Sequence, residues 1–258
     1  MKPQRGGKPA HGEPVVDRAL RVLAAFTKQN EALTLEQLSI RADLPKATTL
    51  RLARRLAAWG ALERMADGTF VVGLRLLEVA TLSPRGHGLR AIALPYLEDL
   101  HHATGQHVLL AVRDGRESVL VERLSAHRAG AVYYRVGARI SLHITGVGQA
   151  LLAYAPPELQ EEVLAGDLTL PWGPDLTAAE LRRTLARVRR RGIATMSTRK
   201  PEPMSSVAAP VFGSGGDAVA ALSVLAPTAS FRPAALAPAV IAVARAVSRA
   251  CYPRSSEH

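Results

Sequence analysis

Two short apolar-periodic segments separated by a tight break constrain this chain more than any other feature. Residues 33–64 read LTLEQLSIRADLPKATTLRLARRLAAWGALER, with the break at Asp43, Leu44 and Pro45. Thr34 followed by Gln37 is a capping-box pattern that begins one helix, and Pro45 suits the first turn of the next. The segment therefore predicts two helices joined by a short turn.

The second of these helices carries its charge on one side. Leu52, Leu56 and Trp59 form its predicted inward stripe, and Gly60 ends it. The outward side has no acidic residue and consists of Lys46, Ala47, Leu50, Arg51, Arg54 and Arg55. The Asp67-Gly68 pair further on lies between two short extended runs, which is typical of a β-hairpin.

A first helix precedes the pair, because apolar residues repeat at helical spacing between Val16 and Phe26. Three helices followed by a hairpin are the elements of a winged helix-turn-helix, whose recognition helix enters the major groove of DNA while basic residues hold phosphates. A small helical bundle with a solvated basic face is the alternative. The DNA-binding interpretation predicts contacts from Thr34, Lys46, Ala47, Thr48, Leu50, Arg51, Arg54, Arg55 and Arg64.

Charge supports a polyanionic partner. The chain has 258 residues, with 33 Lys and Arg against 22 Asp and Glu, a formal net charge of +11 and a pI of about 10.6. The electrostatic field of a protein with this positive charge attracts a phosphate backbone or an anionic membrane surface. We find no apolar run of about 18 residues and no signal-peptide core, which predicts a cytoplasmic protein without a membrane partner. Cys251 is the one cysteine, which excludes an internal disulfide and fits a reducing compartment.

The chain resembles the IclR family of bacterial transcriptional regulators along residues 14–250. The resemblance is carried in order by VDRALRVLAAF, the helix pair, FVVGLRLLEVA, ALPYLEDLHHATGQHVLLAVRDG, YRVGARISLHITGVGQALLAY and SVAAPVFGSGGDAVAALSV. It implies an α+β protein that binds operator DNA as a homodimer or homotetramer. The expected parts are a disordered tail at 1–12, a winged helix-turn-helix domain at 13–73, a linker helix and Ser-Pro-Arg-Gly-His-Gly breaker at 74–89, and a GAF-like effector-binding domain at 90–258.

The second half of the sequence alternates short strands with helices, as an α+β domain on an antiparallel sheet requires. We predict strands at 107–112, 118–124, 132–136, 193–196, 206–212 and 219–225. Predicted helices lie at 90–103, 147–154, 178–191 and 239–249.

The stretch SLHITGVGQALLAY places Gly146 and Gly148 at the start of a helix. Uncovered N–H groups at that end can hold a carboxylate or another anion. Two other interpretations stay open: a dinucleotide-binding loop, which would need a third glycine and a βαβ unit, and glycines that only permit close helix packing.

The resemblance also implies an effector site made of His143, Gly146, Val147, Met196, Ser206, Ser223 and Leu225. Relatives that bind small hydrophilic acids have an acid where Met196 stands and a serine where Leu225 stands. Arg199 and Pro203 likewise replace a usual Glu and Gly. Since Met and Leu remove hydrogen-bond partners and add apolar wall, we expect a larger, partly apolar organic acid. Ordinary core packing is the alternative for Met196 and Leu225.

Enzymatic motifs are not evident. Ser214 stands between glycines without the pattern of a nucleophile elbow, and His101, His102 and His107 lack the spacing of a metal site, so we expect neither catalysis nor a cofactor. The basic run at 187–191 reads as a helix end favoured by the helix dipole, although a second nucleic-acid surface is the alternative. A small-molecule-binding or hydrolytic domain that uses its helix-turn-helix only as a scaffold remains the alternative function.

Overall fold

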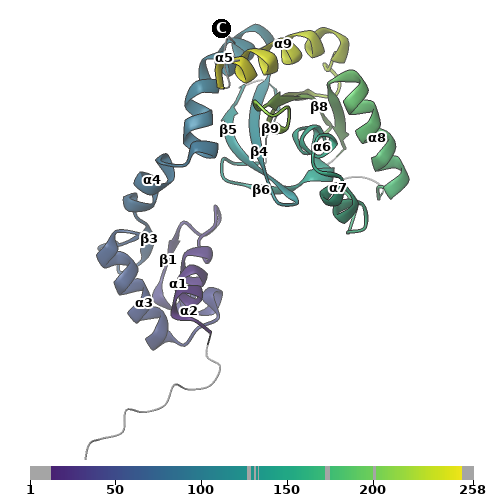
Figure 1. The fold of residues 1–258 in the computed structure, drawn as a ribbon. Helices are drawn as coiled ribbons and strands as arrows, with labels where there is room; N and C mark the ends of the chain where they lie inside the picture. Colours follow the sequence, from purple (N-terminus) through teal and green to yellow (C-terminus); the bar gives the residue numbers. More distant parts are fainter. Residues whose placement is uncertain are drawn as a thin grey trace, which may run out of the picture. The chain divides into compact units, whose positions relative to one another are not determined.

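The computed structural model describes residues 13–126, 129, 130, 132, 134–171, 175–199 and 202–251. The predicted tail at 1–12 lies outside this set. The chain divides into two compact units, of which the first ends at Leu82 and the second begins at Ser83. Figure 1 shows both units.

The N-terminal unit has the predicted helices and hairpin. It contains α1 (Val15–Ala24), β1 (Ala32–Leu33), α2 (Leu35–Ala42), α3 (Lys46–Trp59), β2 (Leu62–Arg64), β3 (Phe70–Val72) and α4 (Leu74–Thr81). Its core joins Val22, Leu38, Leu52 and Phe70, one from each of α1, α2, α3 and β3. The sequence did not predict β1, which is only two residues long and pairs with β3 on the side opposite β2.

Local chemistry sets the tight turn between α2 and α3. The predicted capping box is present, with the Thr34 hydroxyl accepting from the Gln37 amide and the Gln37 side chain accepting from the Thr34 amide. Asp43 ends α2 with a φ of 50°, in the left-handed region. The Arg21 guanidinium of α1 donates to the carbonyls of Ala42 and Asp43. The turn is thus held by a side chain from the first helix.

The predicted inward stripe of α3 is wrong at Trp59. This side chain is 52% exposed, and the Arg75 guanidinium lies 5.7 Å from its ring centroid. Thr49 and Ala53 are fully buried instead. Pro45 precedes α3 as its N-cap rather than opening its first turn.

The C-terminal unit is a six-stranded antiparallel sheet with helices on both faces. Its elements are a π-helical turn (Pro84–Gly88), α5 (Leu89–Thr104), β4 (His107–Asp114), β5 (Glu117–Leu124), β6 (Arg139–Ser141), a 3₁₀ turn (Leu142–Ile144), α6 (Gly146–Ala153), α7 (Pro157–Leu164), α8 (Ala178–Arg191), β7 (Ala194–Thr198), β8 (Met204–Phe212), β9 (Ala218–Pro227) and α9 (Pro233–Cys251). The strand order is β6-β5-β4-β9-β8-β7.

Side chains alternate between two cores on either side of this sheet. On β4, Leu109 and Ala111 face a core shared with α6, α7 and α8, whereas Leu110 and Val112 face a core shared with α5 and α9. Figure 1 shows these helices on the two sides of the sheet. Because both faces are covered, the strands read as continuous apolar runs rather than alternating ones.

Four features differ from the sequence prediction. The described residues of 132–136 are not a strand, and β6 pairs with β5 instead. Helix α7 was not predicted. The breaker at 84–88 is a helical turn that continues into α5. Helix α9 is long and apolar enough to cross a membrane by length and composition, contrary to the predicted absence of such a run, but it packs on the sheet through Val240, Ala244 and Val247.

Helix α6 approaches its neighbours closely at Gly148. A Cβ on Gly148 would lie 2.3 Å from the Leu142 carbonyl oxygen and 2.8 Å from the Thr145 hydroxyl. All eight residues of α6 are buried, so the helix cannot move outward without opening the core. The packing interpretation therefore accounts for Gly148.

We predict that Gly148→Ala lowers the free energy of unfolding by about 1–3 kcal/mol, because the added methyl group overpacks a backbone contact. Chemical denaturation measures the change. Gly166→Ala is the matched control, since a Cβ there would lie 3.4 Å from its nearest neighbour, the Val163 carbonyl oxygen. Equal effects of the two substitutions would contradict the close-approach explanation.

Candidate functional site

The exposed side of α3 presents three arginines with uncompensated charge. Arg51, Arg54 and Arg55 form no ion pair with any residue that the structure describes. Together with Ala47, Leu50 and Ala58 they line an open hollow of about 380 Å³. A hollow lined by arginines and apolar side chains suits the base edges and phosphates of a nucleic acid, since arginine can bind both in a bidentate manner.

The other predicted DNA-binding residues have different surroundings. Lys46 lies 2.7 Å from Glu36 of α2, and this hydrogen bond and the lysine charge hold the pKa of the Glu36 carboxyl below its usual value. Leu50 is half-buried against the N-terminal core rather than fully outward, and Thr48 is also half-buried. Thr34 serves as the α2 cap, and the Arg64 guanidinium lies 5.9 Å from the Phe70 ring centroid.

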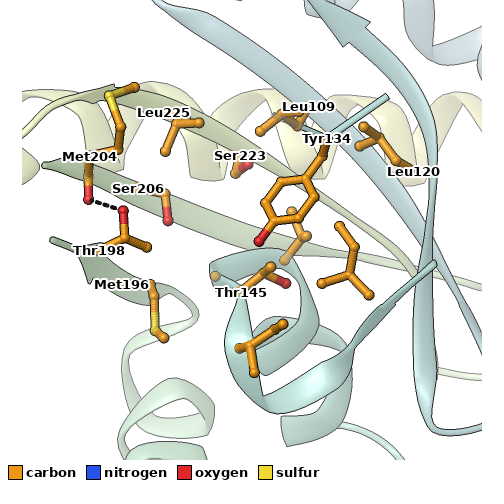
Figure 2. Close-up of a pocket in the computed structure, with 14 residues that line it drawn as sticks. Leu109, Leu120, Tyr134, Thr145, Met196, Thr198, Met204, Ser206, Ser223 and Leu225 are labelled. Atoms are coloured by element: carbon orange, nitrogen blue, oxygen red, sulfur yellow. Dashed lines mark hydrogen bonds between the residues drawn. The ribbon is translucent and has the colours of Figure 1, made fainter. Parts of the chain in front are cut away.

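A pocket opens between the sheet and α6 in the C-terminal unit (Figure 2). It is lined by Leu109, Leu120, Tyr134, Ile140, Ile144, Thr145, Gly146, Val147, Met196, Thr198, Met204, Ser206, Ser223 and Leu225. Its volume is about 60 Å³. A single water needs about 10–15 Å³ on this measure, so the pocket admits a molecule of several non-hydrogen atoms.

Six of the seven residues predicted for the effector site line this pocket. Gly146 and Val147 come from α6, Met196 from β7, Ser206 from β8, and Ser223 and Leu225 from β9. Ser206 and Leu225 both line the pocket because they pair across neighbouring strands, and paired residues share a sheet face. Segments far apart in the sequence thus meet at one end of α6.

His143 is the predicted residue that does not belong to this pocket. It is buried, its Nε2 lies 3.2 Å from the Thr169 carbonyl oxygen, and it lines a separate hollow with Arg139 and Asp167. The 3₁₀ turn at Leu142–Ile144 directs His143 away, while Ile144 reaches the pocket.

The N-terminal end of α6 supplies the polar side of the pocket. The Thr145 hydroxyl accepts from the Gly148 amide at 3.0 Å, while the amides of Gly146 and Val147, in the first turn, have no acceptor within the helix. A Cβ on Gly146 would lie 2.7 Å from the Ser206 hydroxyl oxygen. The helix end and Ser206 are therefore adjacent, which concentrates hydrogen-bond donors at one place.

The rest of the wall is largely apolar. Met196 and Leu225 lie on the pocket surface, and the Met196 sulfur accepts from the Gln149 side-chain amide at 3.3 Å. The Thr198 hydroxyl donates to the Met204 carbonyl, as Figure 2 shows. Within the described part of the chain, no charged side chain lines the pocket.

Sequence reasoning missed Tyr134, whose ring projects into the pocket (Figure 2). Burial raises the pKa of its phenol to about 12, so the hydroxyl stays protonated at neutral pH. The apolar run around it predicted a strand at 132–136, but the described residues there form neither helix nor strand, so the predicted strand did not assign Tyr134 to the pocket.

The sheet topology excludes the dinucleotide-loop interpretation of Gly146 and Gly148. Every paired strand among those described is antiparallel, whereas that loop requires a parallel βαβ unit. The described residues also contain no group of three or more His, Cys, Asp or Glu arranged to hold a metal ion.

Comparison with known proteins decides the family. The IclR helix-turn-helix domain matches residues 15–66, and the C-terminal domain of bacterial IclR transcriptional regulators matches residues 82–249. The chain belongs to the IclR family. It is accordingly a ligand-responsive, DNA-binding transcriptional regulator of the α+β fold expected from its sequence.

Its relatives are transcriptional regulators rather than enzymes. The regulator BhcR of Paracoccus denitrificans is 30% identical over 256 residues, covering 96% of this chain and 91% of BhcR. The repressor AllR of Escherichia coli is 26% identical over 235 residues, covering 87% of each chain. A crystal structure of an IclR homologue from Microbacterium hydrocarbonoxydans, complexed with 4-hydroxybenzoate, is 31% identical with a TM-score of 0.85, covering 92% of this chain and 99% of that one.

Proposed function

We propose that this regulator binds operator DNA through α3 and responds to an aromatic organic acid bound between α6 and the sheet. The observation that carries the effector proposal is a pocket with hydrogen-bond donors gathered at the α6 end and an apolar wall elsewhere. The bound 4-hydroxybenzoate in the Microbacterium homologue supports an aromatic acid of that type. We infer that the carboxylate binds near Gly146, Val147 and Ser206, and that Met196 and Leu225 contact the ring.

DNA binding is assigned to the arginine side of α3. Arg51 lies nearer the N-terminal end of the helix, where a recognition helix contacts base edges, and Arg55 lies one turn further along. Lys46 is paired with Glu36, so we assign it a smaller share of the phosphate contacts. Such a protein acts in the cytoplasm, where operator DNA is found.

We predict that Arg51→Ala weakens binding to a preferred duplex by about 1–3 kcal/mol, with a smaller loss on unrelated duplexes, because it removes a base contact. Arg55→Ala should weaken all duplexes alike and reduce the salt slope by about one, because it removes a phosphate contact. Fluorescence anisotropy with a duplex selected from a random pool measures both, and Arg183→Ala in α8 is the control. Unchanged preference and affinity in Arg51→Ala would refute the groove assignment.

Exposed apolar side chains on and next to α4 support the association of this chain with further copies of itself. Four apolar side chains within the nine residues 74–82 are each at least 48% exposed: Leu74, Leu77, Val79 and Leu82. A concentration of exposed apolar side chains is typical of a protein–protein interaction site. A single winged unit also contacts too little DNA for tight operator binding, and two-fold dimers on two half-sites are the usual solution. We infer a homodimer or homotetramer in which α4 contributes to the contact.

We predict a mass of two or four times the 27.5 kDa chain by light scattering at micromolar concentration. Leu77→Glu should lower this mass, because it places a charge in a buried apolar contact. Glu78→Gln, on the adjacent exposed position, is the control. A wild-type monomer whose mass operator DNA does not change would exclude the proposed assembly.

We predict that Met196→Asp weakens 4-hydroxybenzoate binding by about tenfold or more, because it places a carboxylate beside the apolar ring and repels the ligand charge. Thr195→Asp adds the same charge one residue earlier on β7, on the exposed side of the strand, and should bind as wild type does. Isothermal calorimetry with aromatic, alkyl and short hydroxy acids measures the order of affinities. Tightest wild-type binding of the smallest hydrophilic acid, with Met196→Asp harmless, would disprove the assignment.

A further inference from the structure

The described residues of the segment that supplies Tyr134 to the pocket form neither helix nor strand, and side chains from other elements form hydrogen bonds to several of them. We call residues 125–138 the strap; the structure describes 125, 126, 129, 130, 132 and 134–138 of it. Its far end is fixed by the backbone, since the Gly137 amide donates to the Leu120 carbonyl and the Leu120 amide donates to the Ala138 carbonyl. Two side chains, His107 of β4 and Arg123 of β5, form hydrogen bonds to other described residues of the strap.

His107 makes three hydrogen bonds to the near end of the strap. Its Nδ1 accepts from the Ala126 amide at 3.1 Å, and its Nε2 donates to the carbonyls of Ala129 at 2.9 Å and Gly130 at 3.0 Å. The ring is only 2% exposed. An amide can only donate and carbonyls can only accept, so these partners fix the neutral tautomer with its proton on Nε2.

This attachment lies directly beside the pocket. His107 pairs across the sheet with Leu225, which lines the pocket. Gly130 approaches Met204, another lining residue, so closely that a Cβ on Gly130 would lie 3.2 Å from the Met204 sulfur. Arg123 adds a second attachment, because its Nη1 donates to the Val132 and Tyr134 carbonyls at 3.1 and 2.7 Å.

We propose that His107 is a positioning residue for the effector pocket: it fixes the strap that carries Tyr134 into the pocket wall, and this attachment slows effector release. The inference rests on the proposed effector function of the pocket. His107 does not line the pocket itself and acts through the strap.

The attachment depends on the neutral ring. Burial, and to a smaller extent the charges of Arg123 and His101, lower the pKa of His107 from 6.5, against the raising effect of the two carbonyls. A histidine with a lowered pKa binds fewer protons when attached than when released, so the attachment weakens as pH falls below 6.5. Protonation would place an Nδ1–H group against the Ala126 amide and remove its acceptor.

The test compares His107→Phe with His101→Phe in the full chain. Phe keeps a ring in each position and removes the nitrogens. His101 also forms a hydrogen bond with a backbone carbonyl, that of Gln106, but forms none with the described residues of the strap. We expect His107→Phe to raise the 4-hydroxybenzoate dissociation rate at least about fivefold with little change in association rate, and His101→Phe to leave it unchanged. Stopped-flow mixing measures both rates.

A pH series separates this role from a loss of stability alone. The wild-type dissociation rate should rise as pH falls from 8 to about 5.5, a range in which a carboxylic acid stays ionised. His107→Phe should lose that dependence. A variant that kept the wild-type pH profile would overturn the proposal.

Hydrogen exchange of the ligand-free protein tests the attachment independently of any effector. His107→Phe and Arg123→Met should both raise exchange in peptides covering the strap, and Arg123→Met serves if His107→Phe does not fold. Unchanged strap exchange in both variants overturns the attachment. Raised exchange with unchanged dissociation overturns its role in effector release. A wild type that binds no aromatic acid refutes the proposed effector, and the exchange result still decides whether His107 holds the strap.

Discussion

The packing of α6 against the sheet is the contact on which the C-terminal unit depends. Every residue of α6 is buried, and Gly148 meets the Leu142 carbonyl at a distance that no side chain would allow. An apolar helix that is covered on all sides leaves its polar backbone groups only at its ends. Here the first turn lies beside Ser206, so the contact that stabilises the core also places hydrogen-bond donors at one end of the pocket.

Charge has a similar double role in the N-terminal unit. Arg21 uses its guanidinium to hold the turn between α2 and α3, and Lys46 is paired with Glu36. Arg51, Arg54 and Arg55 have no such ion pair among the described residues, and they project from a helix whose buried side carries Leu52 and Ala53. Basic residues that fold the unit are thereby distinct from those whose charge is available to a polyanion.

Elements with strong local signals could be predicted from the sequence. The structure reproduces the Thr34 capping box, the Asp67-Gly68 hairpin and the bounds of α8, all of which follow from residues close in the chain. The strap was predicted wrongly, as a strand at 132–136, because its described residues are held by hydrogen bonds from His107 and Arg123, which are distant in the sequence. The same limit explains Tyr134, whose backbone carbonyl accepts a hydrogen bond from Arg123 of a distant strand. Trp59 fitted the apolar stripe of α3 but lies in its last turn, where Arg75 covers it from outside the core.

An effector can change operator affinity only if it binds two arrangements of the protein unequally. The pocket lies on one face of the sheet, and helix α5 packs on the opposite face. Helix α5 follows residues 74–88 in the chain. Strand β5 reaches both, since Leu120 lines the pocket and the buried carboxylate of Glu122 forms an ion pair with Arg90 of α5. A close-packed sheet transmits displacement instead of absorbing it. A ligand that displaces β5 therefore also displaces Glu122 and acts on its ion pair with Arg90 at the start of α5.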